Sequence, residues 1–597
     1  MKRRPTRSAM WGRGILLACA AIFCTSVICA QLPKSRHPGF DKISTDLQNA
    51  TGKVDVIVTF KQPLSGAMHK KVFDQGGALK RELRMLKSGQ YTLPASALEK
   101  LAADPAVAHI ALNRKVHTLG TAGIVPALDY HNETINAAAG WNQGLDGTGI
   151  GVAVIDSGIA SVDDLTAGNI VYSQDFTGLG SAADQYGHGT HVSGIIAGNG
   201  TDSTGGANFY TFRGIAPGVN LVNMRVLDAS GNGTIADLID AIQTVIQLQS
   251  TYNIRVINMS LGSGVYESYT QDPLCQAVEQ AYQAGIVVVV SAGNEGRNDD
   301  AGTNGYGTIT SPGNDPYVIT VGAMNTMNTP DPSDDIPTSY TSKGPSLWDQ
   351  VIKPDLVAPG NLIVSLYTPP ETLAQEAPGN ALPYDVYQTN GSLAVSPSYF
   401  ALSGTSMAAP MVAGAVALML QQTPSLTPDQ VKALLMVTAD KNLVQNSVVT
   451  DPVSGQTFPV QADIFTVGAG YLDIGAALTA TSTPPPAGTS AMSPFAQIDA
   501  NGEVEMVNGT PLNGESVIWG GSVLWGSSVL WGSSVLWGSS AAQDESVLWG
   551  SSVLWGSSED QSNSVLWGSS VLWGSSVLWG SSTSTGKLAL QSDKPKR

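Results

Sequence analysis

Between about residues 140 and 480, apolar runs of strand length alternate with helical patterns. Four runs are almost continuously apolar, as in strands buried on both faces: GVAVID, LVNMRVL, RVINMSLG and IVVVVSAG. Between them, residues 234–246 place apolar side chains on one helical face, and residues 272–285 begin with an Asp-Pro cap and stop at a glycine. This alternation predicts an α/β fold with a mainly parallel sheet, whose functional sites lie beyond the carboxyl ends of the strands.

Four polar residues fall at the ends of these elements. Asp156 ends the first run, His188 opens a helix of small residues, and Asn294 follows the fourth run. Ser406 stands at the start of the apolar run that ends at Leu420. Each alone has an ordinary structural explanation, such as a helix cap, a turn amide or a buried structural histidine.

Taken together, the four residues indicate nucleophilic catalysis. A serine hydroxyl becomes a good nucleophile when an imidazole accepts its proton, and a carboxylate holds that imidazole in the required tautomer. The oxyanion that forms next needs fixed donors, which an amide and a helix start can supply. Pro410 falls inside the helix predicted after Ser406, and a capping serine alone does not explain it. These observations favour a nucleophile at Ser406.

The segments around these residues resemble the motifs of the subtilisin-like serine peptidases, the subtilase family. They are VAVIDSGI, YGHGTHVSGIIAG, SAGNEG and SGTSMAAPMVAGAVALML, within residues 127–480. The resemblance implies a three-layer α/β domain and a serine endopeptidase that cleaves protein or peptide substrates and needs no cofactor for catalysis. It implies that Asp156 orients His188, which acts as general base and then general acid. It also implies that Ser406 attacks the peptide carbonyl, and that the Asn294 side chain and the Ser406 N–H form the oxyanion hole.

The same resemblance suggests where substrate and metal would bind. Extended edges that pair with a substrate strand are expected at Gly231 and Gly233, and at the segment Ser260, Leu261 and Gly262. Asp164, in VDDL, matches a calcium ligand of the family. A structural calcium ion is therefore part of the expectation.

The first 30 residues have the layout of a secretory signal peptide. Basic residues precede an apolar stretch from Ile15 to Ile28, which ends in Cys29-Ala30. Three of the four cysteines lie in this segment, so only Cys275 remains for the exported chain, and no internal disulfide can form. We therefore expect a secreted or cell-surface protein.

Residues 31–118, with a core at 53–117, resemble the inhibitory propeptide of the same family, and this resemblance implies a propeptide here. Within it, residues 53–60 read as a strand, residues 76–86 as the start of a helix, residues 90–95 as extended, and residues 96–112 as a helix followed by a strand. Residues 1–118 hold 19 Lys and Arg against 7 Asp and Glu, whereas the whole chain holds 31 against 48. An acidic body argues against nucleic-acid binding, and a basic propeptide would complement it as an intramolecular chaperone and inhibitor.

A different composition begins after residue 480. Residues 481–515 are a linker region that begins with a Pro-rich stretch, residues 516–582 repeat the hexapeptide S-V-L-W-G-S, and residues 583–597 form a C-terminal tail. The even period favours a stack of short strands, and a low-complexity segment without fixed structure is the alternative. A row of tryptophans suggests contact with a glycan or a cell surface. The competing hypothesis for the whole chain is accordingly an adhesion or display protein whose main functional module is this repeat.

Overall fold

The computed structural model describes residues 42–118, 129–165, 169–300, 303–389, 391–451, 455–480, 488 and 490–498. Beyond these it describes only the backbone of short strands between 504 and 578. The predicted signal peptide lies outside the described residues.

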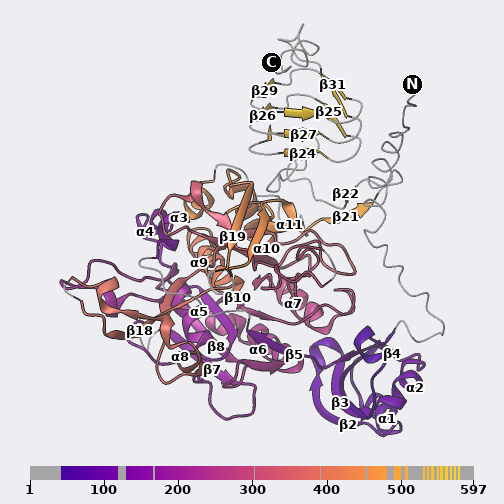
Figure 1. Cartoon of the computed structure of the whole chain (residues 1–597). Coiled ribbons are helices and arrows are strands. Elements are labelled where there is room, and N and C mark those ends of the chain that lie inside the picture. Colours follow the sequence, from indigo (N-terminus) through magenta and orange to yellow (C-terminus); the bar gives the residue numbers. More distant parts are fainter. Residues whose placement is uncertain are drawn as a thin grey trace, which may run out of the picture.

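An eight-stranded sheet forms the centre of the body (Figure 1). Its order is β14-β13-β12-β10-β6-β8-β7, with β15 paired to β13, and every pair except β13–β14 is parallel. This confirms the mainly parallel sheet. The strands are β6 (Gly151–Asp156), β7 (Ile170–Asp175), β8 (Asn220–Arg225), β10 (Ile254–Met259), β12 (Val287–Ser291), β13 (Ile319–Asn325), β14 (Ile336–Pro337) and β15 (Leu356–Pro359).

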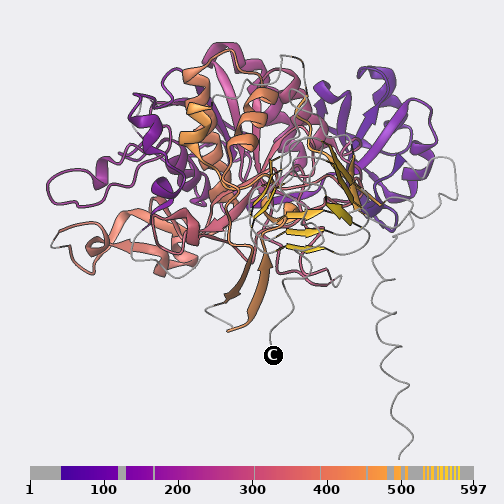
Figure 2. The same cartoon turned by 90° about the horizontal axis from the view of Figure 1, so that it is seen from above.

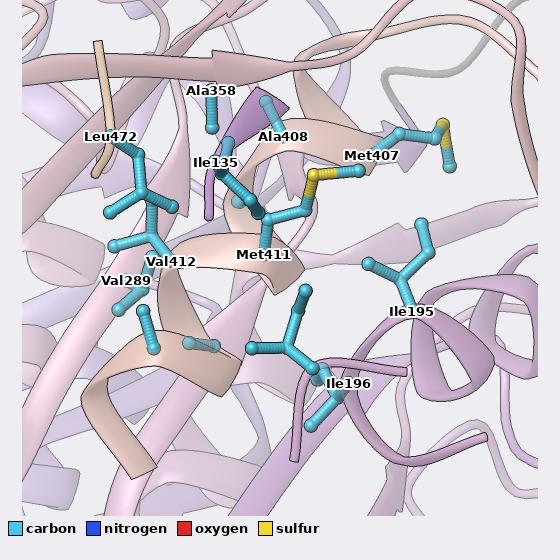
Figure 3. Close-up of a cluster of buried hydrophobic side chains, with 14 of the residues drawn as sticks. Ile135, Ile195, Ile196, Val289, Ala358, Met407, Ala408, Met411, Val412 and Leu472 are labelled. Carbon is cyan, nitrogen blue, oxygen red and sulfur yellow. The ribbon is translucent and has the colours of Figure 1, made fainter. Parts of the chain in front are cut away.

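Helices cover both faces of this sheet. Val152 and Val154 of β6 face a core formed with α5 (His188–Ala197) and α9 (Thr405–Gln422). Ala153 and Ile155 face a second core with α6 (Ile235–Tyr252) and α7 (Pro273–Gln283). Figure 3 shows Met411 and Val412 of α9 among the side chains of the first core. The other helices of the body are α3 (His131–Thr134), α4 (Ala138–Trp141), α8 (Thr372–Glu376), α10 (Pro428–Thr438), α11 (Ile464–Val467) and α12 (Ile474–Thr479).

The N-terminal segment folds into a unit with its own core beside the body (Figures 1 and 2). Its antiparallel sheet has the order β2-β3-β1-β4. The helix predicted from residue 76 is wrong: residues 78–83 form strand β2, which pairs with β3. The elements are β1 (Lys53–Phe60), α1 (Gly66–Phe73), β2 (Ala78–Leu83), β3 (Ser88–Pro94), α2 (Leu98–Ala102) and β4 (Val107–Leu112).

Strand β5 (Lys115–Thr118) leaves this unit and enters the body. It lies between β9 (Asn232–Thr234) and β11 (Leu261–Gly262) and pairs antiparallel with both. Ion pairs join the same two parts, from Arg81 to Asp237 at 2.9 Å and from Arg114 to Glu267 at 2.8 Å. The basic unit and the acidic body are therefore in direct contact.

Contacts of the body continue past residue 480. The buried Ser493 donates a hydrogen bond of 2.6 Å to Asp355 and accepts one of 2.8 Å from Lys432. The backbone of Ile352 donates to Pro494. Residues 491–498 therefore pack on the peptidase-like body, although the sequence places them in the linker region.

The remaining strands form small sheets. In the repeat segment, three parallel sheets each pair strands that lie 18 residues apart, as in Ser534↔Ser552↔Ser570. Elsewhere the strands are β16 (Ile363–Leu366), β17 (Ala381–Pro383), β18 (Val395–Leu402), β19 (Asn446–Thr450), β20 (Thr457–Gln461), β21 (Phe495–Ile498) and β22 (Val504–Val507). The repeat strands are β23 (Val529–Leu530), β24 (Ser534–Leu536), β25 (Ser540–Gln543), β26 (Val547–Trp549), β27 (Ser552–Leu554), β28 (Ser558–Gln561), β29 (Val565–Trp567), β30 (Ser570–Leu572) and β31 (Ser576–Leu578).

Candidate active site

Asp156 and His188 meet at the carboxyl end of the sheet. Asp156 is the last residue of β6, and His188 is the first residue of α5. The His188 Nδ1 lies 2.8 Å from Asp156 Oδ1, which also accepts the Ser157 N–H at 2.7 Å. Both side chains are almost fully buried, and His188 Nε2 has no hydrogen-bond partner among the described residues. The carboxylate thus holds the imidazole ring in place and favours the tautomer in which Nδ1 carries the proton and Nε2 can accept one.

Ser406 is held at the start of α9 by a reciprocal contact with Ser260. The Ser406 Oγ donates to the Ser260 carbonyl at 2.9 Å, and the Ser260 Oγ donates to the Ser406 carbonyl at 2.8 Å. Pro410 explains the second bond, because proline lacks the N–H that would bond to the carbonyl four residues earlier in a helix. The Ser260 hydroxyl occupies that acceptor instead.

Asn294 is oriented by the residue that precedes Ser406. Its Oδ1 accepts hydrogen bonds from the N–H and the hydroxyl of Thr405, at 3.0 and 3.1 Å. The Thr405 hydroxyl in turn accepts the Gly293 N–H at 3.1 Å. These bonds fix Oδ1 as the acceptor end of the Asn294 amide and therefore fix the direction of its Nδ2 donor. A preorganised anion site requires a donor held in a fixed direction. Sequence reasoning missed Thr405, and only its position beside Ser406 could have singled it out.

Four of the five residues predicted on substrate edges lie where β5 enters the body. Gly233 pairs with Val116, Gly262 with His117 and Leu261 with Thr118, and Ser260 directly precedes β11. The Val116 side chain is fully buried in the interface.

Gly231 does not lie on a paired strand. It has a left-handed backbone, with φ at 71°, in the turn before β9, and a Cβ there would meet the Tyr186 ring at 2.7 Å. Its contribution is therefore a turn that a side chain would obstruct, rather than an edge that pairs with a strand.

Asp164 is occupied by donors of the protein itself. Its two oxygens accept the Tyr399 hydroxyl at 2.6 Å and the Asp202 N–H at 2.7 Å. Burial raises the pKa of this carboxyl group. Within the described ranges, no group of three or more His, Cys, Asp or Glu side chains is arranged to hold a metal ion. Asp164 therefore does not fit the expected calcium site, because tyrosine and backbone take the place of a cation.

The site lies in a chain with clear relatives. Residues 147–455 match the model of the subtilase family. The serine protease AprX of Bacillus subtilis (strain 168) is 36% identical over 414 residues, which are 66% of this chain and 85% of that protein. Subtilisin E of the same organism is 33% identical over 390 residues, 64% of this chain and 84% of that protein.

A solved structure shows the same fold. Fervidolysin from Fervidobacterium pennivorans, a keratinolytic enzyme related to subtilisin, matches with a TM-score of 0.54 at 21% identity, over 77% of this chain and 65% of that one. Family model, relatives and fold together define a serine endopeptidase. The chain belongs to the subtilase family. None of the helices in the described ranges is both long and apolar enough to cross a membrane.

Proposed function

We propose that this chain is the precursor of a secreted serine endopeptidase that removes its own N-terminal unit. The observation that carries this is β5, which lies between β9 and β11 as a substrate strand would, next to Ser260 and Ser406. Export rests on the layout of residues 1–30 and agrees with the similarity to an extracellular serine proteinase of Thermus sp. (strain Rt41A).

The proposed mechanism follows from the geometry of the four polar residues. His188 Nε2 accepts the proton of the Ser406 hydroxyl as the oxygen turns from the Ser260 carbonyl and attacks the peptide carbonyl. Asp156 holds the ring and stabilises its charged form through the 2.8 Å contact. The Ser406 N–H and the Asn294 amide stabilise the oxyanion, and His188 then gives the proton to the leaving amine. Water releases the acyl group by the same steps.

The strand register selects one bond for self-cleavage. Thr118 pairs with Leu261, and the residue before Leu261, Ser260, has its carbonyl 2.9 Å from Ser406 Oγ, so we infer that the chain is cut one residue beyond Thr118. Residues 119–128 lie outside the described part of the chain. The bond we assign is Leu119–Gly120, one residue beyond the propeptide end at residue 118 that the sequence predicts. Amino-terminal sequencing of the exported protein should therefore begin at Gly120, and a start at any other residue would refute self-cleavage at this bond.

Replacing the nucleophile tests the proposal as a whole. Ser406→Ala should lower kcat about a million-fold, the loss caused by removing the serine of a subtilisin triad, and should leave the N-terminal unit attached. Ser425→Ala, at an exposed serine after α9, is the matched control. Peptide hydrolysis and intact mass are the readouts, and near-normal hydrolysis by the Ser406 variant would sink the assignment.

A second role, attachment to a glycan or cell surface, is proposed for the hexapeptide segment. Its support is the pairing of identical hexapeptides 18 residues apart, which is typical of a solenoid that presents the same residue at each level. A chain ending near residue 510 should keep peptidase activity and lose retention on cells or insoluble polysaccharide. Equal retention of both chains would exclude this role.

A further inference from the structure

A short segment of the body that contains α8 contacts the turn at residues 184–187, directly before His188. Two backbone N–H groups of α8 donate to this turn, from Thr372 to the Gln185 carbonyl at 3.1 Å and from Leu373 to the Tyr186 carbonyl at 3.0 Å. The Thr372 hydroxyl also donates to the Ala229 carbonyl at 2.7 Å. The segment that contains α8 is therefore hydrogen-bonded both to the turn before His188 and to the segment that leads into β9.

The turn itself is organised around the carboxylate of Asp184. Its Oδ1 accepts the Ser157 hydroxyl and the N–H groups of Tyr186 and Gly187, at 2.9, 3.0 and 2.8 Å. Its Oδ2 accepts the N–H and the hydroxyl of Thr190, at 2.8 and 2.7 Å. Burial, the larger effect, raises the pKa of Asp184 above its ordinary value, and the five donors act against this by stabilising the ionised form. They also fix the backbone on both sides of His188.

Glu371 fills the space directly behind this turn. It is 6% exposed, its Oε2 accepts the Thr368 N–H at 3.1 Å, and its Oε1 has no hydrogen-bond partner among the described residues. A Cβ on Gly187 would lie 2.7 Å from Glu371 Oε2, so the carboxyl group packs against the backbone of the residue before His188. Gly187 has φ at 107°, so the site also requires glycine there.

The proton of this carboxyl pair is assigned to Glu371, because Glu371 accepts one hydrogen bond and Asp184 accepts five. Burial and the nearby Asp184 carboxylate raise the pKa of Glu371 to about 8. Arg225 of β8 does not neutralise the pair, because it donates to the carbonyls of Ser181 and Ala183 and to the Gln185 side chain. The other titratable groups of the surrounding elements are Asp156, Tyr186, His188, Asp228, Tyr367 and Glu376.

We propose that Glu371 is a positioning residue for His188, which holds the turn at 184–187 in place while its carboxyl group is protonated. The inference rests on the proposed role of His188 as the catalytic base. When Glu371 loses its proton to solvent, two buried carboxylates face each other across Gly187, and their repulsion displaces the turn. No covalent step is involved.

The test compares pH profiles of kcat for Glu371→Gln and the wild type. The amide keeps the shape of the side chain and cannot ionise, so the variant should hold its kcat between pH 7 and 9.5, whereas the wild-type kcat falls at least about threefold. Glu376→Gln, at the exposed last residue of α8, should follow the wild type. Superimposable profiles for Glu371→Gln and the wild type would overturn the proposal.

Stability gives a second readout with a defined sign. The ordinary pKa of 4.5 applies in the unfolded chain and about 8 in the folded protein, so between these values the folded state holds more protons and wild-type stability falls as pH rises. Glu371→Gln should lack this component of the decline, as measured by thermal unfolding at pH 5 and pH 8.

Labelling distinguishes failure of this inference from failure of the proposed function. A sulfonyl fluoride should modify Ser406 in the wild type and in the Glu371→Gln variant at pH 7. If the wild type is not labelled, the proposed function itself fails. If it is labelled while the pH profiles coincide, only the role of Glu371 is excluded.

Discussion

Thr405 orients the Asn294 side chain by donating two hydrogen bonds to its Oδ1. Removing the amide with Asn294→Ala should lower kcat by about a hundred- to a thousand-fold and change KM little, because the lost donor acts on charge that develops only in the transition state. Steady-state kinetics on a peptide substrate measure this. An effect confined to KM would contradict an oxyanion role.

The Tyr399 hydroxyl donates a hydrogen bond to Asp164, the residue that was expected to bind calcium. Tyr399→Phe removes the hydroxyl that donates to the buried Asp164 carboxylate and should lower the free energy of unfolding by about 1–3 kcal/mol. Tyr387→Phe removes a hydroxyl bonded to the neutral Ser396 and is the matched control, with a smaller expected loss. Full recovery of the Tyr399 variant on adding calcium would show that a metal can replace the hydroxyl.

Ser493, within the linker region, completes a buried charge cluster. Asp355 accepts Lys353 at 2.7 Å, Lys432 at 3.0 Å and Ser493 at 2.6 Å, and all four side chains are at most 2% exposed. A chain that ends at residue 490 should therefore lose more stability than Ser493→Ala, which should itself cost about 1–3 kcal/mol. Denaturant unfolding of chains ending at 490 and at 510 checks this, and equal midpoints would exclude a role for residues 491–498.

The central elements could be read from the sequence because burial on both faces leaves a strong apolar signal. The runs at β6, β8, β10 and β12 are of this kind. Strand β2 was missed because ALKREL consists of good helix formers, and its pairing with β3 outweighs that local preference. No sequence pattern singles out Glu371, because its proposed role depends on contact with a turn that lies nearly 190 residues earlier in the chain.

Across the molecule, the N-terminal unit is held to the body by charges that become buried. Arg114 is 4% exposed at its side chain and pairs with Glu267 of the body and Asp46 of its own unit. Arg114→Ala in a separately added 42–118 unit should weaken its proposed inhibition of the mature enzyme about a hundredfold, because Glu267 then keeps only His109 of its two buried partners from this unit. Arg84→Ala, at a largely exposed arginine that pairs within the unit, should leave inhibition unchanged. Equal inhibition constants for all three units would contradict this account.

The position of β5 between β9 and β11 bears on when peptidase activity would appear after cleavage. In the proposed precursor, β5 is a tethered inhibitor strand, so its effective concentration at the site does not depend on the total enzyme concentration. After the proposed cleavage behind Leu119, the same contacts become bimolecular. Under this proposal, activity would appear as the two pieces dissociate, so dilution of the cleaved enzyme would raise its active fraction.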